Sequence, residues 1–183
     1  MRKSQKKAAI MQTAEELFYE HGFHAVGVKS ILEQAGVAPM TMYYHFQSKE
    51  EMIKEILMQR EERYFQLLED KLNKENGANA YIRSLIHAHI DWLSAAGFNG
   101  CLFLRAKQEY EGVNDEIALL SRDHKKKLLN KIDNDMKHLQ AAPSLSIQIS
   151  IILEGLTSMD QILGLDKLKD IAMDLVRSLE ATE

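Results

Sequence analysis

Two short helical stretches near the start of the chain, and the turn that joins them, restrict the possible folds more than any other feature. Residues 28–34 have their apolar side chains at helical spacing, and residues 39–46 form a second short segment that opens with Pro39. Proline suits the first turn of a helix, because its missing N–H has no partner there. Residues 35–38, Ala-Gly-Val-Ala, form a tight turn. Two short helices joined in this way, with a further helix packed on both, are typical of a helix-turn-helix at about residues 27–46.

The rest of the chain predicts helices and no sheet. A helix over residues 6–21 precedes the motif and ends at Gly22, and a Ser-Lys-Glu-Glu capping box at residues 48–51 opens a long helix. Five more helices follow, separated by breaks rich in Gly, Asn and Pro. Residues 145–151 alternate like a strand, but a lone strand would have no partner, so we expect a helix there. Because this helix is apolar nearly all round, we expect burial on several sides, with Ser144 as its cap.

We therefore expect an all-α fold with a three-helix N-terminal helix-turn-helix domain and a C-terminal helical ligand-binding and dimerisation domain. The expected boundary divides residues 1–50 from residues 51–183. Charge supports this division: residues 1–49 carry six basic and four acidic side chains, whereas the remainder carries 17 basic and 23 acidic ones. A basic head on an acidic body allows a local DNA footprint and keeps the body away from phosphates.

The cellular setting expected for the chain is the cytoplasm. The sequence contains one cysteine, Cys101, so an intrachain disulfide is impossible and a reducing compartment is the simplest interpretation. No apolar stretch approaches the roughly 18 residues that span a bilayer. Glutamates also interrupt the N-terminal apolar pattern before a signal-peptide core develops.

Residues 10–57, IMQTAEELFYEHGFHAVGVKSILEQAGVAPMTMYYHFQSKEEMIKEIL, resemble the N-terminal domain of the tetracycline-repressor (TetR/AcrR) family. The resemblance covers roughly residues 7–57, and its domain-wide spacing is more specific than a lone helix-turn-helix pattern. It implies a transcription regulator, commonly a repressor, that binds a palindromic operator as a homodimer and is released by a small-molecule effector. The features that carry it are Ala14, Leu17, Phe18, Gly22, Phe23, Val28, Ile31, Ala35, Gly36, Val37, Thr41, Tyr43, His45, Phe46, Ser48, Lys49, Glu50 and Met52.

The resemblance also assigns roles in DNA binding. Tyr43 and Lys49 resemble family residues that contact phosphates, and Lys29 and His45 are further candidates for positioning on the backbone. Met40, Thr41 and Tyr44 are the candidates for reading base edges, since methyl groups can touch thymine and a hydroxyl can donate or accept. In an unrelated helical protein, both tyrosines would more simply be packing residues. The chain departs from the family at Val26-Gly27, where Ser or Thr is usual, and at Ala38 and Met40, which bears on the operator sequence.

The resemblance implies a ligand cavity among the middle helices and a dimer made by the last two. Candidate ligand-binding residues are His89, Trp92, Phe98, Cys101, Phe103, Arg105, Tyr110, His124 and Met159. Apolar walls with a few polar groups are typical of small-molecule pockets. Buried histidines that simply pair within the core are an equally good interpretation of His89 and His124. No metal site is expected, because no metal-binding spacing of His or Cys occurs.

Two other classes of function are weighed against this interpretation. An enzyme would need a converged acid, base or nucleophile, and the sequence shows no phosphate loop, nucleophile elbow or metal cluster, so we expect no catalysis and no cofactor. A helical ligand-binding or interaction module without DNA binding is the alternative, but it would not need an exposed Thr41–Tyr44 surface.

Overall fold

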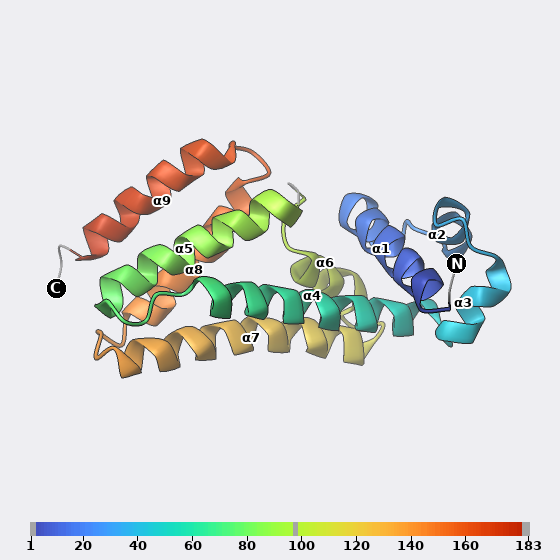
Figure 1. The fold of residues 1–183 in the computed structure, drawn as a ribbon, viewed down its shortest axis with the longest axis horizontal. Coiled ribbons are helices and arrows are strands. Elements are labelled where there is room, and N and C mark those ends of the chain that lie inside the picture. Colours follow the sequence, from blue (N-terminus) through green and yellow to red (C-terminus); the bar gives the residue numbers. More distant parts are fainter. Residues whose placement is uncertain (1–2, 97–98, 181–183) are drawn as a thin grey trace. The chain divides into compact units, whose positions relative to one another are not determined.

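The computed structural model describes residues 3–96 and 99–180, and over these residues the chain is helical with no strand (Figure 1). The all-α prediction is confirmed. The helices are α1 (Lys3–His21), α2 (Val28–Gln34), α3 (Pro39–His45), α4 (Lys49–Lys71), α5 (Gly77–Ala96), α6 (Leu102–Tyr110), α7 (Asp115–His138), α8 (Leu145–Met159) and α9 (Leu165–Glu180).

The chain forms two compact units. The first unit combines Met1–Glu61 with Leu102–Asp123, and the second combines Glu62–Cys101 with His124–Glu183. Helices α4 and α7 therefore each begin in the first unit and end in the second. Helix α6 and the start of α7, which the sequence analysis grouped with the effector domain, belong to the same unit as the helix-turn-helix.

In the first unit, α1, α2 and α3 pack against one another. The buried face of α1 repeats at helical spacing through Ile10, Ala14 and Phe18, none of which is exposed. Met42 and Phe46 are also buried, at α3 and its end. The recognition segment thus has one fully buried face, which holds a helix of only seven residues in place.

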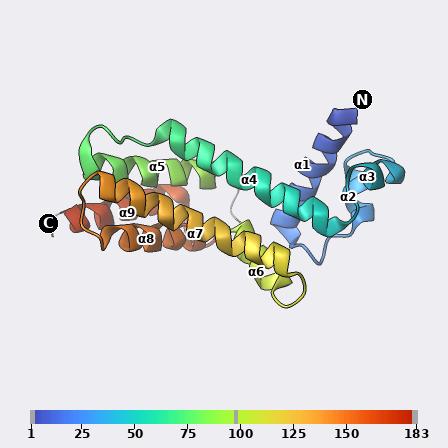
Figure 2. The ribbon, with the colours of Figure 1, turned by 90° about the horizontal axis from the view of Figure 1, so that it is seen from below.

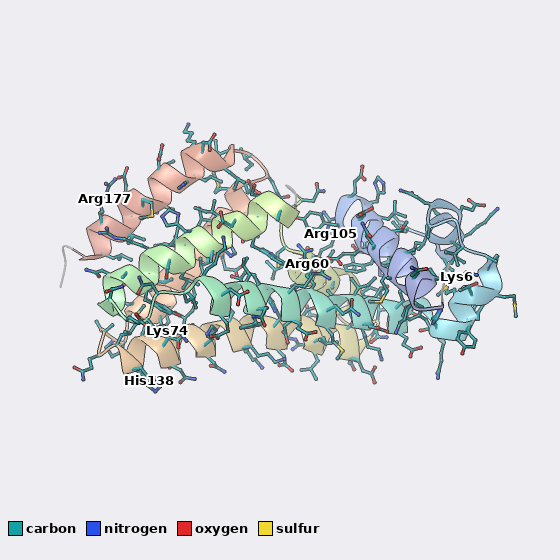
Figure 3. All side chains as sticks on the ribbon, in the orientation of Figure 1. Lys6, Arg60, Lys74, Arg105, His138 and Arg177 are labelled. Atoms are coloured by element: carbon teal, nitrogen blue, oxygen red, sulfur yellow. The ribbon has the colours of Figure 1, made fainter. Side chains whose placement is uncertain are left out.

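The end of α1 is held by two charged side chains of α6. Gly22 ends α1 with a φ of +91°, as predicted for a left-handed stop. The Glu109 carboxylate accepts hydrogen bonds from the Phe23 N–H at 3.0 Å and the His24 N–H at 2.7 Å. Arg105, labelled in Figure 3, donates to the carbonyl oxygens of Phe18 and Tyr19 at 3.2 and 2.7 Å. The bond to Tyr19 satisfies a carbonyl group that a helix end leaves without a partner, and the bonds from Phe23 and His24 fix the loop that follows.

Two predicted caps are present in the first unit. The Ser48 hydroxyl accepts the Glu51 N–H at 3.1 Å, as predicted for the cap of α4. The Glu51 carboxylate reaches back one residue further than in a regular capping box, and accepts the Gln47 N–H at 2.5 Å. The Asn114 side chain accepts the Ile117 N–H at 3.1 Å at the start of α7.

In the second unit, α5 packs against α8 and α9, and α8 packs against α9 (Figure 2). The predicted helix at α8 is confirmed, but two details differ. Ser144 makes no capping bond through its side chain. The prediction that this helix is buried on several sides is wrong within a single chain. Ile147 and Ile151 are 59% and 65% exposed, whereas Ile149 is buried. No described helix is long and apolar enough to cross a bilayer.

Candidate DNA-binding surface and effector site

The face of α3 opposite its buried side is open to solvent. Met40 is 79% exposed, Tyr43 65% and Tyr44 62%, while Thr41 is partly buried. Gly36 adopts a φ of +64° in the turn before α3, which lets the chain reverse sharply between α2 and α3. The tyrosines are therefore not packing residues of the first unit. An exposed, short helix that is rigidly backed satisfies the geometric requirement for entering a major groove roughly 12 Å wide.

The candidate phosphate-contacting residues differ in their exposure and in the contacts that they make within the protein. Lys29 extends from α2 with 86% of its side chain exposed, and its ammonium lies 3.8 Å from the Glu33 carboxylate in a surface pair. His45 packs edge-on against Tyr44, with ring centroids 5.1 Å apart. The Nε2 atom of His45 is buried and has no hydrogen-bond partner among the described residues.

Lys49 is bound to the protein itself. Its Nζ donates to the Phe23 carbonyl oxygen at 2.6 Å and lies 5.6 Å from the centroid of the Phe18 ring. Partial burial lowers the pKa of Lys49, opposed by the nearby carboxylates of Glu50 and Glu109. An ammonium has three donors, so a phosphate contact would be made in addition to the bond that ties α4 to the α1–α2 loop.

Three of the predicted effector residues meet in the second unit. Trp92, His89 and His124 surround Tyr64, with ring centroids 5.2, 5.9 and 6.0 Å from that of Tyr64. The Tyr64 ring is buried and stands on α4 at a position that sequence analysis treated as one more apolar residue of its face. Only its spacing from the other core positions of α4 could have indicated its place in this cluster.

A chain of hydrogen bonds fixes the protonation of His89. The Thr157 hydroxyl donates to the Leu153 carbonyl oxygen at 3.0 Å, so it accepts from Nε2–H of His89 at 2.9 Å. Nδ1 of His89 is then the acceptor for the Tyr64 hydroxyl, also at 2.9 Å. Burial lowers the pKa of His89 to about 3, with Lys125 adding to the effect, so the imidazole is neutral at physiological pH. We call Tyr64, His89 and Thr157 the buried relay.

The other predicted effector residues are not all gathered there. Phe103, Arg105 and Tyr110 stand on α6 in the first unit, and Arg105 is bonded to the end of α1. Cys101 is half-buried, Met159 is 38% exposed at the end of α8, and Phe98 lies outside the described residues. The described residues contain no group of three or more His, Cys, Asp or Glu side chains that could hold a metal ion.

Two charged residues of α6 were not recognised as a pair in the sequence. Arg105 was listed for the effector cavity and Glu109 was not singled out, yet both bind the end of α1 across a separation of more than 80 residues. No local pattern encodes a contact over such a distance.

A family profile described as "Bacterial regulatory proteins, tetR family" matches residues 10–56. The chain is 40% identical over 57 residues to the HTH-type transcriptional regulator UidR of Escherichia coli strain K12, a match that covers 31% of this chain and 29% of UidR. It is 27% identical over 92 residues to the fatty acid metabolism regulator protein of Bacillus subtilis, covering 50% of this chain and 47% of that protein. The matches to these curated relatives thus span less than half of their length.

Solved structures share the fold over nearly the whole chain. A TetR-family transcriptional regulator from Streptomyces coelicolor superimposes with a TM-score of 0.86 at 21% identity, covering 96% of this chain and 94% of that one. A transcriptional regulator from Saccharomonospora viridis, solved in complex with choline, gives a TM-score of 0.79 at 21% identity and covers 95% and 96% of the two chains. At these identities, the likeness concerns the fold alone.

Proposed function

The chain is a member of the TetR family of bacterial regulatory proteins through residues 10–56, and from that premise we propose that it is a cytoplasmic transcriptional repressor. In this proposal it binds a palindromic DNA operator as a homodimer, and a small-molecule effector releases it. The observation that carries the proposal is the open face of α3, where Met40, Tyr43 and Tyr44 are exposed above a fully buried opposite face.

The open face suits DNA chemically. Tyrosine hydroxyls can donate to phosphate oxygens, and the methyl groups of Met40 and Thr41 can contact thymine. We assign Tyr43, Lys29, Lys49 and His45 to positioning on the backbone, and Met40, Thr41 and Tyr44 to reading bases.

The exposed apolar face of the last two helices supports the homodimer. Ile147 and Ile151 on α8 are exposed, as are Ile171 and Leu175 on α9, and α8 packs directly against α9. Large apolar side chains that gather in the open on two neighbouring helices are typical of an interaction site. Two copies can bury these faces together as a four-helix bundle with twofold symmetry. A symmetric dimer would present two α3 helices about 34–36 Å apart, or at a multiple, for a palindrome.

The effector site we propose is the aromatic cluster around Tyr64. Rings flanking a neutral histidine with polar neighbours fit a small organic ligand. The S. viridis neighbour, which was solved with choline, supports a small-molecule ligand for a protein of this fold. Effector and DNA would then favour different conformations and weaken each other's binding reciprocally.

The test is selection of bound duplexes from a random DNA pool with the full chain. We expect a palindromic consensus, bound with an affinity that falls steeply as salt rises because phosphate contacts release counterions. A Tyr43→Ala and Tyr44→Ala double variant should lose the selected sequence while retaining its helical content and dimeric state. If no sequence is enriched and binding is absent at low salt, the chain is instead an interaction module without DNA binding.

A further inference from the structure

A polar pocket of about 740 Å³ lies wholly within the first unit, outside both sites described above. The α1–α2 loop, the segment that leads into α4 and the corner between α6 and α7 form its walls. Its chemically active members are His24, Glu50, Glu51, Lys54 and Tyr110. The volume falls within the range of pockets that hold small molecules.

The Tyr110 side chain brings an unused polar group to this pocket. Tyr110 is only 2% exposed, and its ring packs against Phe23 and His24 with centroids 5.9 and 4.8 Å apart. Its hydroxyl makes no hydrogen bond to any of the residues that the structure describes. Burial raises the pKa of Tyr110 to about 12, with Glu50 and Glu109 adding to it, so the hydroxyl stays protonated. The Tyr110 oxygen is not one of the fully buried polar atoms that lack a partner, so it is open at the pocket wall and can accept a hydrogen bond from a ligand.

The charged side chain of this pocket that lacks a partner among the described residues is a carboxylate, that of Glu50. Lys54 pairs with Glu116, and the Glu51 carboxylate accepts the Gln47 N–H. Within the described residues, Glu50 makes neither an ion pair nor a hydrogen bond, although it lies on the same pocket wall. A ligand that complements this pocket therefore carries positive charge and N–H donors.

We infer that this pocket binds a small organic ammonium ion. Its N–H groups would donate to the Glu50 carboxylate and the Tyr110 hydroxyl, and its carbon chain would lie against the exposed His24 ring. The ligand would join the start of α4, which three residues separate from the recognition helix α3, to the α6–α7 corner. The inference stands independently of the proposed function, because it concerns a site in the DNA-free protein.

Calorimetric titration of the full chain with 1,4-diaminobutane, at low salt and without DNA, tests the inference. We expect one saturable site per chain. Glu50→Gln and Tyr110→Phe should each weaken it by about tenfold or more, since each removes one partner of a charged donor. Glu62→Gln, which changes the same charge on α4 outside the pocket, should bind like the unaltered protein. Absence of saturable binding, or an unchanged affinity in Glu50→Gln, would overturn the assignment.

Two further measurements keep the result specific. Tetramethylammonium carries the charge but no N–H donor, so it should bind at least tenfold more weakly than the diamine; equal affinity would refute the hydrogen-bonded site. An equal loss in Glu62→Gln would also refute it, because it would indicate general attraction to an acidic chain. Thermal unfolding without amine checks that each variant folds. If Tyr110→Phe fails to fold, Glu50→Gln on the pocket wall still tests the site.

Discussion

The two units both expose apolar side chains, but of different chemical kinds. The first unit exposes Met40, Tyr43 and Tyr44 on a helix of seven residues, and the second exposes isoleucine and leucine on two adjacent helices. A tyrosine hydroxyl can form a hydrogen bond to a phosphate or a base edge, whereas an aliphatic side chain forms no hydrogen bond and gains free energy only from leaving water. The difference teaches that the first surface suits a polar partner and the second suits an apolar surface like itself.

The two units also differ in the polar side chains that hold them together. In the first unit, charged Arg105 and Glu109 satisfy backbone groups at the end of α1. In the second, the buried relay is neutral, and its central histidine has lost the ability to ionise near neutral pH. The first unit therefore holds a helix end by charge, while the second depends on a protonation state.

The largest effect is expected from placing charge on the aliphatic face. Ile147→Asp with Ile151→Asp should convert dimers to monomers, because each new carboxylate would be buried without a partner. Since an operator palindrome needs two heads, DNA affinity should fall by more than about a hundredfold. Light scattering measures the mass, and anisotropy measures the affinity.

Met58→Asp is the matched control, because Met58 is 58% exposed on α4 in the first unit. It should leave both measurements unchanged. A double Ile variant that remains dimeric would show that the aliphatic face of the second unit is not the dimer surface, and the contrast between the two units would fail.

Helix α8 shows how far the sequence predicts this contrast. Its helical state followed from the lack of a partner strand, and its apolar character from composition. The sequence did not predict which apolar residues of α8 face the core and which face outward. An apolar residue gives the same sequence pattern whether it packs against its own chain or against another chain. In α9 likewise, Leu168 and Ala172 are buried but Ile171 and Leu175 are exposed, although all four read as one face.

The features of the candidate sites also divide into those that the sequence predicted and those that it did not. The exposed face of α3, the Ser48 cap of α4 and the left-handed Gly22 depend on neighbours within a few residues, so local rules predicted them. The bonds of Arg105 and Glu109, and the position of Tyr64 among three rings, depend on contacts between distant segments. Arg105 was therefore expected near an effector and is found on the end of α1.

The next largest effect concerns pH and the buried relay. His89 has a folded pKa lowered to about 3, against about 6.5 in the unfolded chain. The unfolded state therefore binds the extra proton as pH falls below 6.5, and stability decreases. Between pH 7 and pH 5 the free energy of unfolding should drop by about 2 kcal/mol. Urea titrations at both pH values measure it, and His89→Gln should be less stable at pH 7 but change much less between them.

A smaller effect is expected from removing one hydroxyl of the relay. Tyr64→Phe leaves Nδ1 of His89 buried without a donor, so the free energy of unfolding should fall by about 1–2 kcal/mol. The same change at Tyr43, which is 65% exposed, should leave the stability unaltered. Chemical unfolding of both variants tests this, and equal stabilities would mean that the relay does not stabilise the second unit.

The smallest effects should separate two lysines of the first unit. Lys29→Ala removes an exposed ammonium, so it should weaken binding to all DNA sequences alike and reduce the salt slope by about one, with no loss of stability. Lys49→Ala removes the bond to the Phe23 carbonyl oxygen as well, so the free energy of unfolding should fall by about 0.5–1 kcal/mol. Anisotropy at several salt concentrations, beside urea unfolding, distinguishes the two. If Lys49→Ala lowers the stability but leaves the salt slope intact, Lys49 positions α4 against the α1–α2 loop and makes no phosphate contact. If both substitutions alter only the salt slope, the bond to Phe23 does not stabilise the first unit.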